Sequence, residues 1–121
     1  MHALTLHDQL LERGAHSIMS AIEGPPVAWN SIQDVFEAVL VHEQKVTALI
    51  NNIATIAMQN NDHAFYQFIQ MFVKEQVEEE KSATDILQRV KRLDGHPALL
   101  DQLDIELGTR VFVQPFTNAA N

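Results

Sequence analysis

Residues 68–81 read FIQMFVKEQVEEEK, and their apolar side chains recur at intervals of three and four residues. That spacing is typical of one face of an α-helix. The same face continues in both directions and predicts a helix over residues 63–93, with Asp62 as a side chain that can cap its first turn. Gln76 and Glu79 interrupt an otherwise apolar seam, which comprises Phe65, Ile69, Phe72, Ala83, Ile86, Val90 and Leu93.

A second long helix is predicted just before this one, over residues 32–59. Ser31 is a good N-cap residue, and Asp34 follows it at the position that a weak capping box requires. Glu43 occupies a slot in which the pattern expects an apolar side chain; the apolar positions are Ile32, Phe36, Val39, Val46, Ile50, Ile53 and Ala57. Because residues 60–62 are typical of a turn, the two long helices should form an antiparallel hairpin.

Two shorter helices complete the prediction. Residues 1–13 form a helix that Gly14 ends, and the missing cap at its start indicates the end of a longer helix. Residues 15–29 can stretch to roughly 50 Å, which exceeds the length of about 42 Å for a helix of about 28 residues. This crossover should make the first two helices parallel. A last short helix is expected over residues 97–107, and residues 109–121 should be extended or frayed.

Composition limits the class of protein. The chain has 121 residues, 46% hydrophobic and 20% charged, with no Cys. These values predict one globular domain over residues 1–121 and exclude a disulfide-stapled scaffold. The four predicted helices make this domain all-α. The sequence has no apolar stretch long enough to cross a membrane, and its start lacks the pattern of a signal peptide. We therefore expect a cytoplasmic protein. Sixteen Asp and Glu residues against eight Lys and Arg give a net charge of -8, which disfavours nucleic acid and favours cations.

The interruptions in the two seams point to a metal site. Glu43 and Glu79 are equally distant from Asn61 in sequence, so both should lie roughly 27 Å from the turn and face each other. A buried carboxylate costs several kcal/mol unless it is protonated, paired or bound to metal. Neither seam contains Lys or Arg, and Gln76 adds a neutral oxygen one turn before Glu79. Such oxygen ligands suit ferrous iron, manganese or magnesium.

Other polar residues are weaker indicators. By itself, the run Glu78–Glu80 is typical of a solvated helix face. An imidazole ligand would favour iron or zinc over magnesium, and His2 is the histidine best placed to supply one. The remaining histidines are expected to be surface or packing residues: His7, His16, His42, His63 and His96.

The residues around Glu43, HEQKV, together with residues 68–81, resemble the third and fourth helices of bacterial non-haem ferritins. In that family a diiron ferroxidase centre takes a Glu from each of the first and third helices, a Glu-x-x-His pair from the second and a Gln-x-x-Glu pair from the fourth. The resemblance implies that Glu43 and Glu79 hold the second iron and that Gln76 lies beside the dioxygen position. It further implies that His2 binds the first iron and that Glu75 and Glu78 belong to a third, transit iron site. No haem is expected.

The resemblance covers nearly the whole chain, but the start of the chain departs from the family pattern. In the family, the first helix and the Glu of the second-helix pair come before the position that Met1 matches. The sequence therefore contains neither of them. We expect either a truncated ferritin or two copies that pair their hairpins across a two-fold axis, and both hypotheses predict an oligomer.

The expected function is ferritin-type Fe(II) oxidation by dioxygen at a diiron carboxylate site, followed by intracellular iron storage. One alternative is an inactive ferritin-derived structural or regulatory fragment, which pairs with itself or with a full-length paralogue. A second alternative is a related diiron peroxidase or oxygenase.

Overall fold

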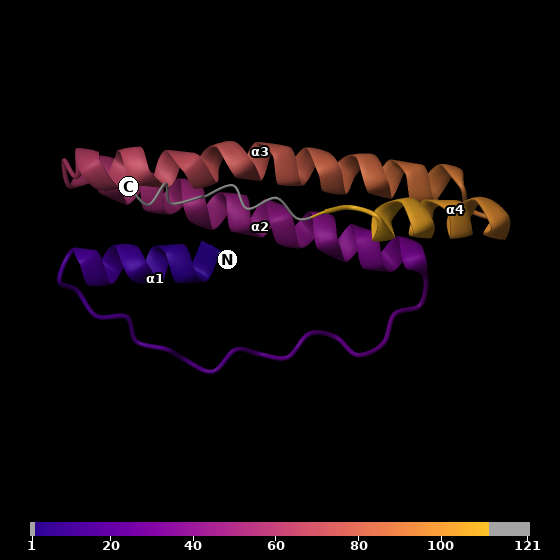
Figure 1. The fold of residues 1–121 in the computed structure, drawn as a ribbon, viewed down its shortest axis with the longest axis horizontal. Helices are drawn as coiled ribbons and strands as arrows, with labels where there is room; N and C mark the ends of the chain where they lie inside the picture. The colour runs from indigo at the N-terminus through magenta and orange to yellow at the C-terminus, as the bar shows by residue number, and fades with distance from the viewer. Residues whose placement is uncertain (1, 112–121) are drawn as a thin grey trace.

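The computed structural model describes residues 2–111 and places four helices there (Figure 1). They are α1 (His2–Glu12), α2 (Ile32–Gln59), α3 (His63–Arg92) and α4 (Pro97–Gly108). These bounds confirm the predicted helices, and the described residues form no strand. The all-α class is therefore confirmed. Most of the tail that was expected to be extended or frayed, residues 112–121, lies outside the described residues.

Local hydrogen bonds explain where the helices begin and end. The Ser31 side chain accepts a hydrogen bond from the main-chain N–H of Asp34 at 3.1 Å, and Asp62 accepts one from Phe65 at 3.1 Å. Gly14 ends α1 with φ +74°, and Asn61 turns the chain between α2 and α3 with φ +54°. Glycine and asparagine tolerate this left-handed conformation better than other residues. All three predicted capping positions are thus confirmed.

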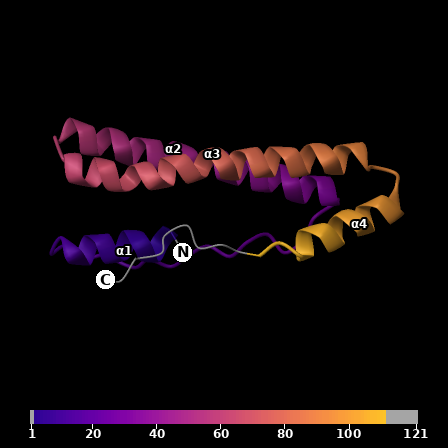
Figure 2. The same ribbon diagram turned by 45° about the horizontal axis from the view of Figure 1, so that its top comes forward.

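The hairpin of α2 and α3 is the centre of the fold (Figures 1 and 2). The two helices run antiparallel, and their facing sides bury a core of Ile50, Ala54, Ile69 and Phe72. Leu6 from α1 packs against this core. The crossover runs the length of the hairpin and returns to its starting end, so α1 and α2 are parallel, as predicted (Figure 1).

An ion pair attaches the end of α1 to the turn of the hairpin. Arg13 Nη1 donates a hydrogen bond of 2.6 Å to Asp62 Oδ2, and the Arg13 guanidinium lies 5.8 Å from the centre of the Phe65 ring. The hydrogen bond from Arg13 and that from the Phe65 main chain hold the pKa of Asp62 below its ordinary value. Asp62 therefore caps α3 and anchors α1 at the same time.

The fourth helix folds back at the opposite end of the hairpin (Figure 2). Leu103 is its one buried residue, at 3% exposure. Arg89 donates two hydrogen bonds of 2.7 Å to the two carboxylate oxygens of Glu106. One apolar anchor and one bidentate ion pair thus attach α4 to α3.

Several apolar side chains of the described bundle remain exposed. Ile32 and Val39 were predicted to lie in the buried seam of α2, and that prediction is wrong for the single chain because both are exposed. Lys91 of α3 pairs with Glu37 beside them at 2.9 Å, but no described residue covers these two side chains. Other exposed apolar residues of α1, α2 and α3 include Leu4, Val41, Leu49, Ile56, Met58, Met71 and Val77. None of the helices within residues 2–111 is long and apolar enough to span a membrane.

Candidate metal centre

Glu43 and Gln76 meet across the α2–α3 hairpin. Gln76 is buried at 1% exposure, and the Glu43 side chain is 24% exposed. The Gln76 Nε2 atom lies 3.1 Å from Glu43 Oε2 and 3.2 Å from the Glu43 main-chain oxygen. The prediction that both polar residues occupy the seam between the long helices is thus confirmed.

The contact determines which way the Gln76 amide faces. An ionised carboxylate and a main-chain carbonyl can only accept hydrogen bonds, so the amide nitrogen must be the atom directed at Glu43. The amide oxygen is then left to face another donor or a cation. Gln76 can therefore orient Glu43 through its nitrogen and offer a neutral ligand through its oxygen.

Thr47 is a member of this cluster that the sequence did not identify. Its hydroxyl donates a hydrogen bond of 3.0 Å to the main-chain oxygen of Glu43, and it lies 3.2 Å from Gln76 Nε2. Its position one helical turn after Glu43 was the available signal, since residues four apart share a helix face. Thr47 thus adds a third polar contact around the buried amide.

A second pair of predicted site residues meets between α1 and α3. His2 Nε2 lies 2.6 Å from Glu75 Oε2, and the two side chains are 35% and 17% exposed. The His2 ring also meets the Phe72 ring edge-on, with centres 5.0 Å apart and an angle of 70° between planes. Sequence reasoning placed His2 and Glu75 at different irons and did not predict this contact.

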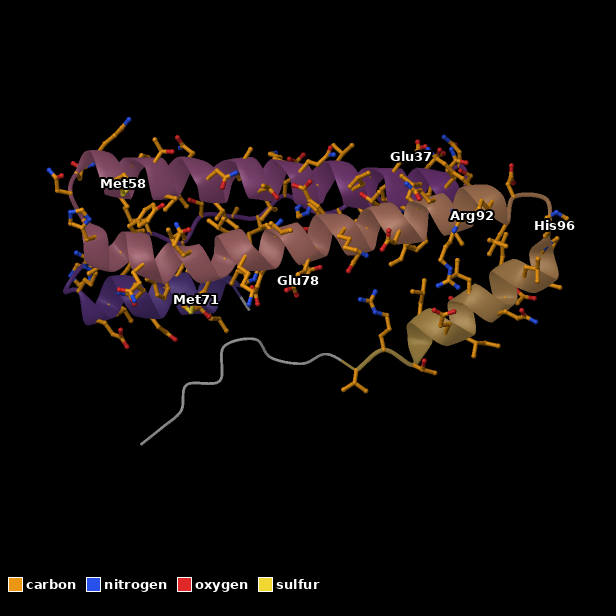
Figure 3. The ribbon with its side chains drawn as sticks, turned by 90° about the horizontal axis from the view of Figure 1, so that it is seen from above. Glu37, Met58, Met71, Glu78, Arg92 and His96 are labelled. Carbon is orange, nitrogen blue, oxygen red and sulfur yellow. The ribbon has the colours of Figure 1, made fainter. Side chains whose placement is uncertain are left out.

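The remaining two predicted site residues, Glu78 and Glu79, are exposed. Figure 3 shows Glu78 on the side of α3 that is turned away from α2. The expectation that Glu79 is enclosed in the seam opposite Glu43 is wrong for the single chain. Glu79 lies one turn beyond Gln76, about 4.5 Å along the helix, and no element of residues 2–111 covers it. Burial of Glu79 therefore requires a further helix.

The acidic cluster has little basic compensation. Neither Glu43 nor Glu79 forms an ion pair with Lys or Arg of residues 2–111; the exposed His42 imidazole lies 3.9 Å from the Glu43 carboxylate. Lys81, which follows the acidic run, is bonded to Asp85 at 2.6 Å. The described residues contain no group of three or more His, Asp or Glu side chains arranged to hold a metal. Any metal centre would therefore combine these oxygens with ligands from another helix.

Sequence comparison finds one matching family and proteins of similar sequence. The ferritin-like domain family matches residues 1–93. The bacterial non-heme ferritin of Staphylococcus aureus strain MRSA252 is 33% identical over 111 residues, which are 92% of this chain and 67% of that protein. The bacterial non-heme ferritin of Bacteroides fragilis strain 638R is 35% identical over 109 residues, covering 90% of this chain and 67% of the relative.

Comparison by structure gives a consistent result. An engineered closed form of Archaeoglobus fulgidus ferritin is 42% identical and matches with a TM-score of 0.90, over 93% of this chain and 69% of that one. Chlorobium tepidum ferritin is 28% identical and matches with a TM-score of 0.75, over 92% of this chain and 68% of that one. Each of these matches extends over more than nine tenths of this chain.

Proposed function

The chain belongs to the ferritin family, whose members bind and store iron, and we propose that it binds Fe(II) and oxidises it with dioxygen. In this proposal Glu43, Gln76 and Glu79 supply oxygen ligands for one iron of a two-iron centre. His2 supplies a nitrogen ligand for the other iron. The ferric product is stored as mineral inside an assembly of subunits in the cytoplasm.

The contact between Glu43 and Gln76 is the observation that carries the proposal. A half-buried carboxylate without a Lys or Arg partner is costly in the seam of two helices. Hydrogen bonds from Gln76 offset part of that cost, and a bound cation would offset more. Carboxylate and amide oxygens are hard ligands, which suit Fe(II) and bind Fe(III) still more strongly because of its higher charge.

The proposed site has two parts, one that binds iron for oxidation and one through which iron passes. Carboxylates at Glu43 and Glu79 neutralise part of the charge that iron gains when each Fe(II) gives an electron to dioxygen. Gln76 holds Glu43 in place through its amide nitrogen. The exposed Glu78 is proposed as part of a transit position for a third iron on the way inward, a position to which the family resemblance also assigns Glu75. The net charge of -8 draws cations toward the protein.

A complete centre requires a partner subunit in this proposal. The partner is either a second copy of this chain or a full-length paralogue, because helices from another subunit can cover Glu79 and the apolar residues that remain exposed. Ferritins assemble into shells, and the exposed Val39, Leu49 and Val77 favour assembly here too. We propose a homo-oligomer of at least two chains.

The proposal is tested by adding Fe(II) to the aerobic protein and following ferric absorbance in the ultraviolet, with the mass of the assembly measured in parallel. The expected result is oxidation faster than in buffer and an assembly of two or more chains. Oxidation at the buffer rate would contradict the proposed activity.

An inactive structural fragment of the family is a second candidate function, and the exposure of Glu79 favours it. It predicts a small assembly, such as a dimer or a complex with a full-length paralogue, and no accelerated oxidation. A diiron peroxidase or oxygenase would instead consume peroxide without mineral growth. The same experiment, repeated with peroxide in place of dioxygen, separates these outcomes.

A further inference from the structure

We propose that Glu75 is a positioning residue that holds the His2 ring as the tautomer with hydrogen on Nε2, so that Nδ1 is the nitrogen whose lone pair can bind a metal ion. This inference rests on the proposed function, because it assigns the way in which the proposed nitrogen ligand is prepared. It differs from the role of transit ligand that the family resemblance implies for Glu75.

The hydrogen bond between the two residues is short and partly shielded from water. His2 Nε2 and Glu75 Oε2 are 2.6 Å apart, and Glu75 is 17% exposed. The neighbouring acidic residues of the same helix, Glu78 and Glu79, are exposed. Glu75 is therefore distinguished from Glu78 and Glu79 by its partial burial, and its partner is the His2 ring.

Packing fixes the plane of the ring as well. The His2 ring meets the edge of Phe72, which is completely buried in α3. One turn along α1, Leu6 packs against the core of the hairpin. Phe72 and Glu75 thus both constrain the orientation of the His2 ring.

The choice of tautomer follows from hydrogen-bonding chemistry. An ionised carboxylate can only accept, so the Nε2 atom of a neutral His2 ring must carry the hydrogen. Nδ1 then carries the lone pair that a metal needs. A carboxylate that receives the outer N–H of a metal-binding histidine orients the ring and raises its basicity as a ligand, and the loss of such a partner costs about 10–100-fold in metal affinity.

The inference also restricts how Glu75 could act in iron transit. The hydrogen bond from His2 uses one lone pair of a Glu75 oxygen. The carboxylate keeps further lone pairs, so an iron at Glu75 would share this carboxylate with His2. Glu75 is therefore assigned first to the nitrogen ligand, and Glu78 to transit.

The first test measures the tautomer directly in the metal-free full chain. Histidine nitrogen shifts are recorded by long-range ¹H–¹⁵N NMR over a pH series, and the tautomer is taken from the spectrum of the neutral ring. His2→Ala identifies the His2 signals. We expect hydrogen on Nε2 in the unsubstituted chain, a shift toward a mixture of tautomers in Glu75→Ala, and no change in the matched control Glu78→Ala. Hydrogen on Nδ1, or an unchanged His2 spectrum in Glu75→Ala, would overturn the inference.

The second test separates positioning from direct ligation. Anaerobic Fe(II) titration by calorimetry compares Glu75→Ala with the unsubstituted chain, and the same substitution is made in a His2→Ala background. We expect about 10–100-fold weaker binding in the first comparison and no further loss in the second, because Glu75 acts through His2. An equal loss in both backgrounds would identify Glu75 as a direct ligand and overturn the proposal.

The experiments distinguish failure of the proposed function from failure of the inference about Glu75. If the unsubstituted chain binds no Fe(II), the proposed function fails, whereas the tautomer measurement still decides whether Glu75 holds the ring. Circular dichroism of each variant shows whether α1 and the hairpin have folded, and alanine is compatible with both helices.

Discussion

The buried amide of Gln76 bridges two helices by donating to both the side-chain oxygen and the main-chain oxygen of Glu43, at 3.1 and 3.2 Å. A polar residue is thereby accommodated at 1% exposure in the middle of an apolar seam. The same contact orients a carboxylate that no Lys or Arg of residues 2–111 neutralises. The same pair of residues thus contributes to the packing of the hairpin and to the proposed iron site.

Removal of this amide should destabilise the hairpin. Gln76→Ala leaves the Glu43 carboxylate partly buried without its donor, and loss of a partner for a buried polar group costs about 1–3 kcal/mol. The free energy of unfolding, measured by urea denaturation with circular dichroism, should fall by that amount.

The control for this prediction is Gln67→Ala, which makes the same change at an exposed position of α3. Exposed substitutions of this kind change stability by no more than about 0.5 kcal/mol. Equal losses for the two variants would show that the contact with Glu43 contributes nothing.

Acid should weaken the attachment of α1 to the hairpin turn. The hydrogen bond from Arg13 lowers the pKa of Asp62 in the folded protein. The ion pair therefore contributes stability above the unfolded-state pKa of about 3.9, and this contribution is lost as pH falls through the lower folded-state value. Asp62→Asn retains a good cap but lacks the charge, so it should be less stable than the unsubstituted chain at neutral pH and equally stable in acid.

The measurement is the urea midpoint as a function of pH for both proteins. Asp104→Asn, which removes the charge of an exposed carboxylate in α4, serves as the control and should show no such convergence. A stability difference between Asp62→Asn and the unsubstituted chain that persists unchanged into acid would contradict the assigned role of the ion pair.

The attachment of α4 should depend on one leucine. Leu103 is the buried residue of that helix, and a buried Leu→Ala substitution costs about 2–5 kcal/mol. Since the hairpin does not require α4 for its core, Leu103→Ala should accelerate hydrogen exchange in α4 and leave the centre of α2 and α3 protected. Ile105→Ala, at a position that is 68% exposed, should leave exchange in α4 unchanged. Faster exchange throughout the hairpin in Leu103→Ala would contradict this local effect.

Much of the fold could be predicted because it depends on local sequence. Helix bounds follow from caps at Ser31 and Asp62 and from the left-handed Gly14, each of which acts within a few residues. The interruptions at Glu43 and Gln76 were visible because apolar periodicity makes a misplaced polar residue conspicuous.

The parts that could not be predicted depend on packing between distant segments. The contact between His2 and Glu75 requires the rotation of α1 about its own axis, and no periodic pattern across the long crossover specifies it. Glu79 follows the seam pattern and is nevertheless exposed, because a position is buried only where a neighbouring helix covers it. Periodicity indicates which face is apolar but not which part of that face is covered.

The central claim, that Glu43 and Glu79 together hold iron for oxidation, is tested most directly by the initial rate of Fe(II) oxidation in aerobic solution. The rate is compared among the unsubstituted chain, Glu79→Ala and the adjacent control Glu80→Ala, with folding and assembly mass verified for each. We predict that Glu79→Ala reduces the protein-dependent rate by at least about tenfold, since loss of a ligand should cost no less than loss of its outer partner, while Glu80→Ala retains it. Equal rates in all three proteins would contradict the claim.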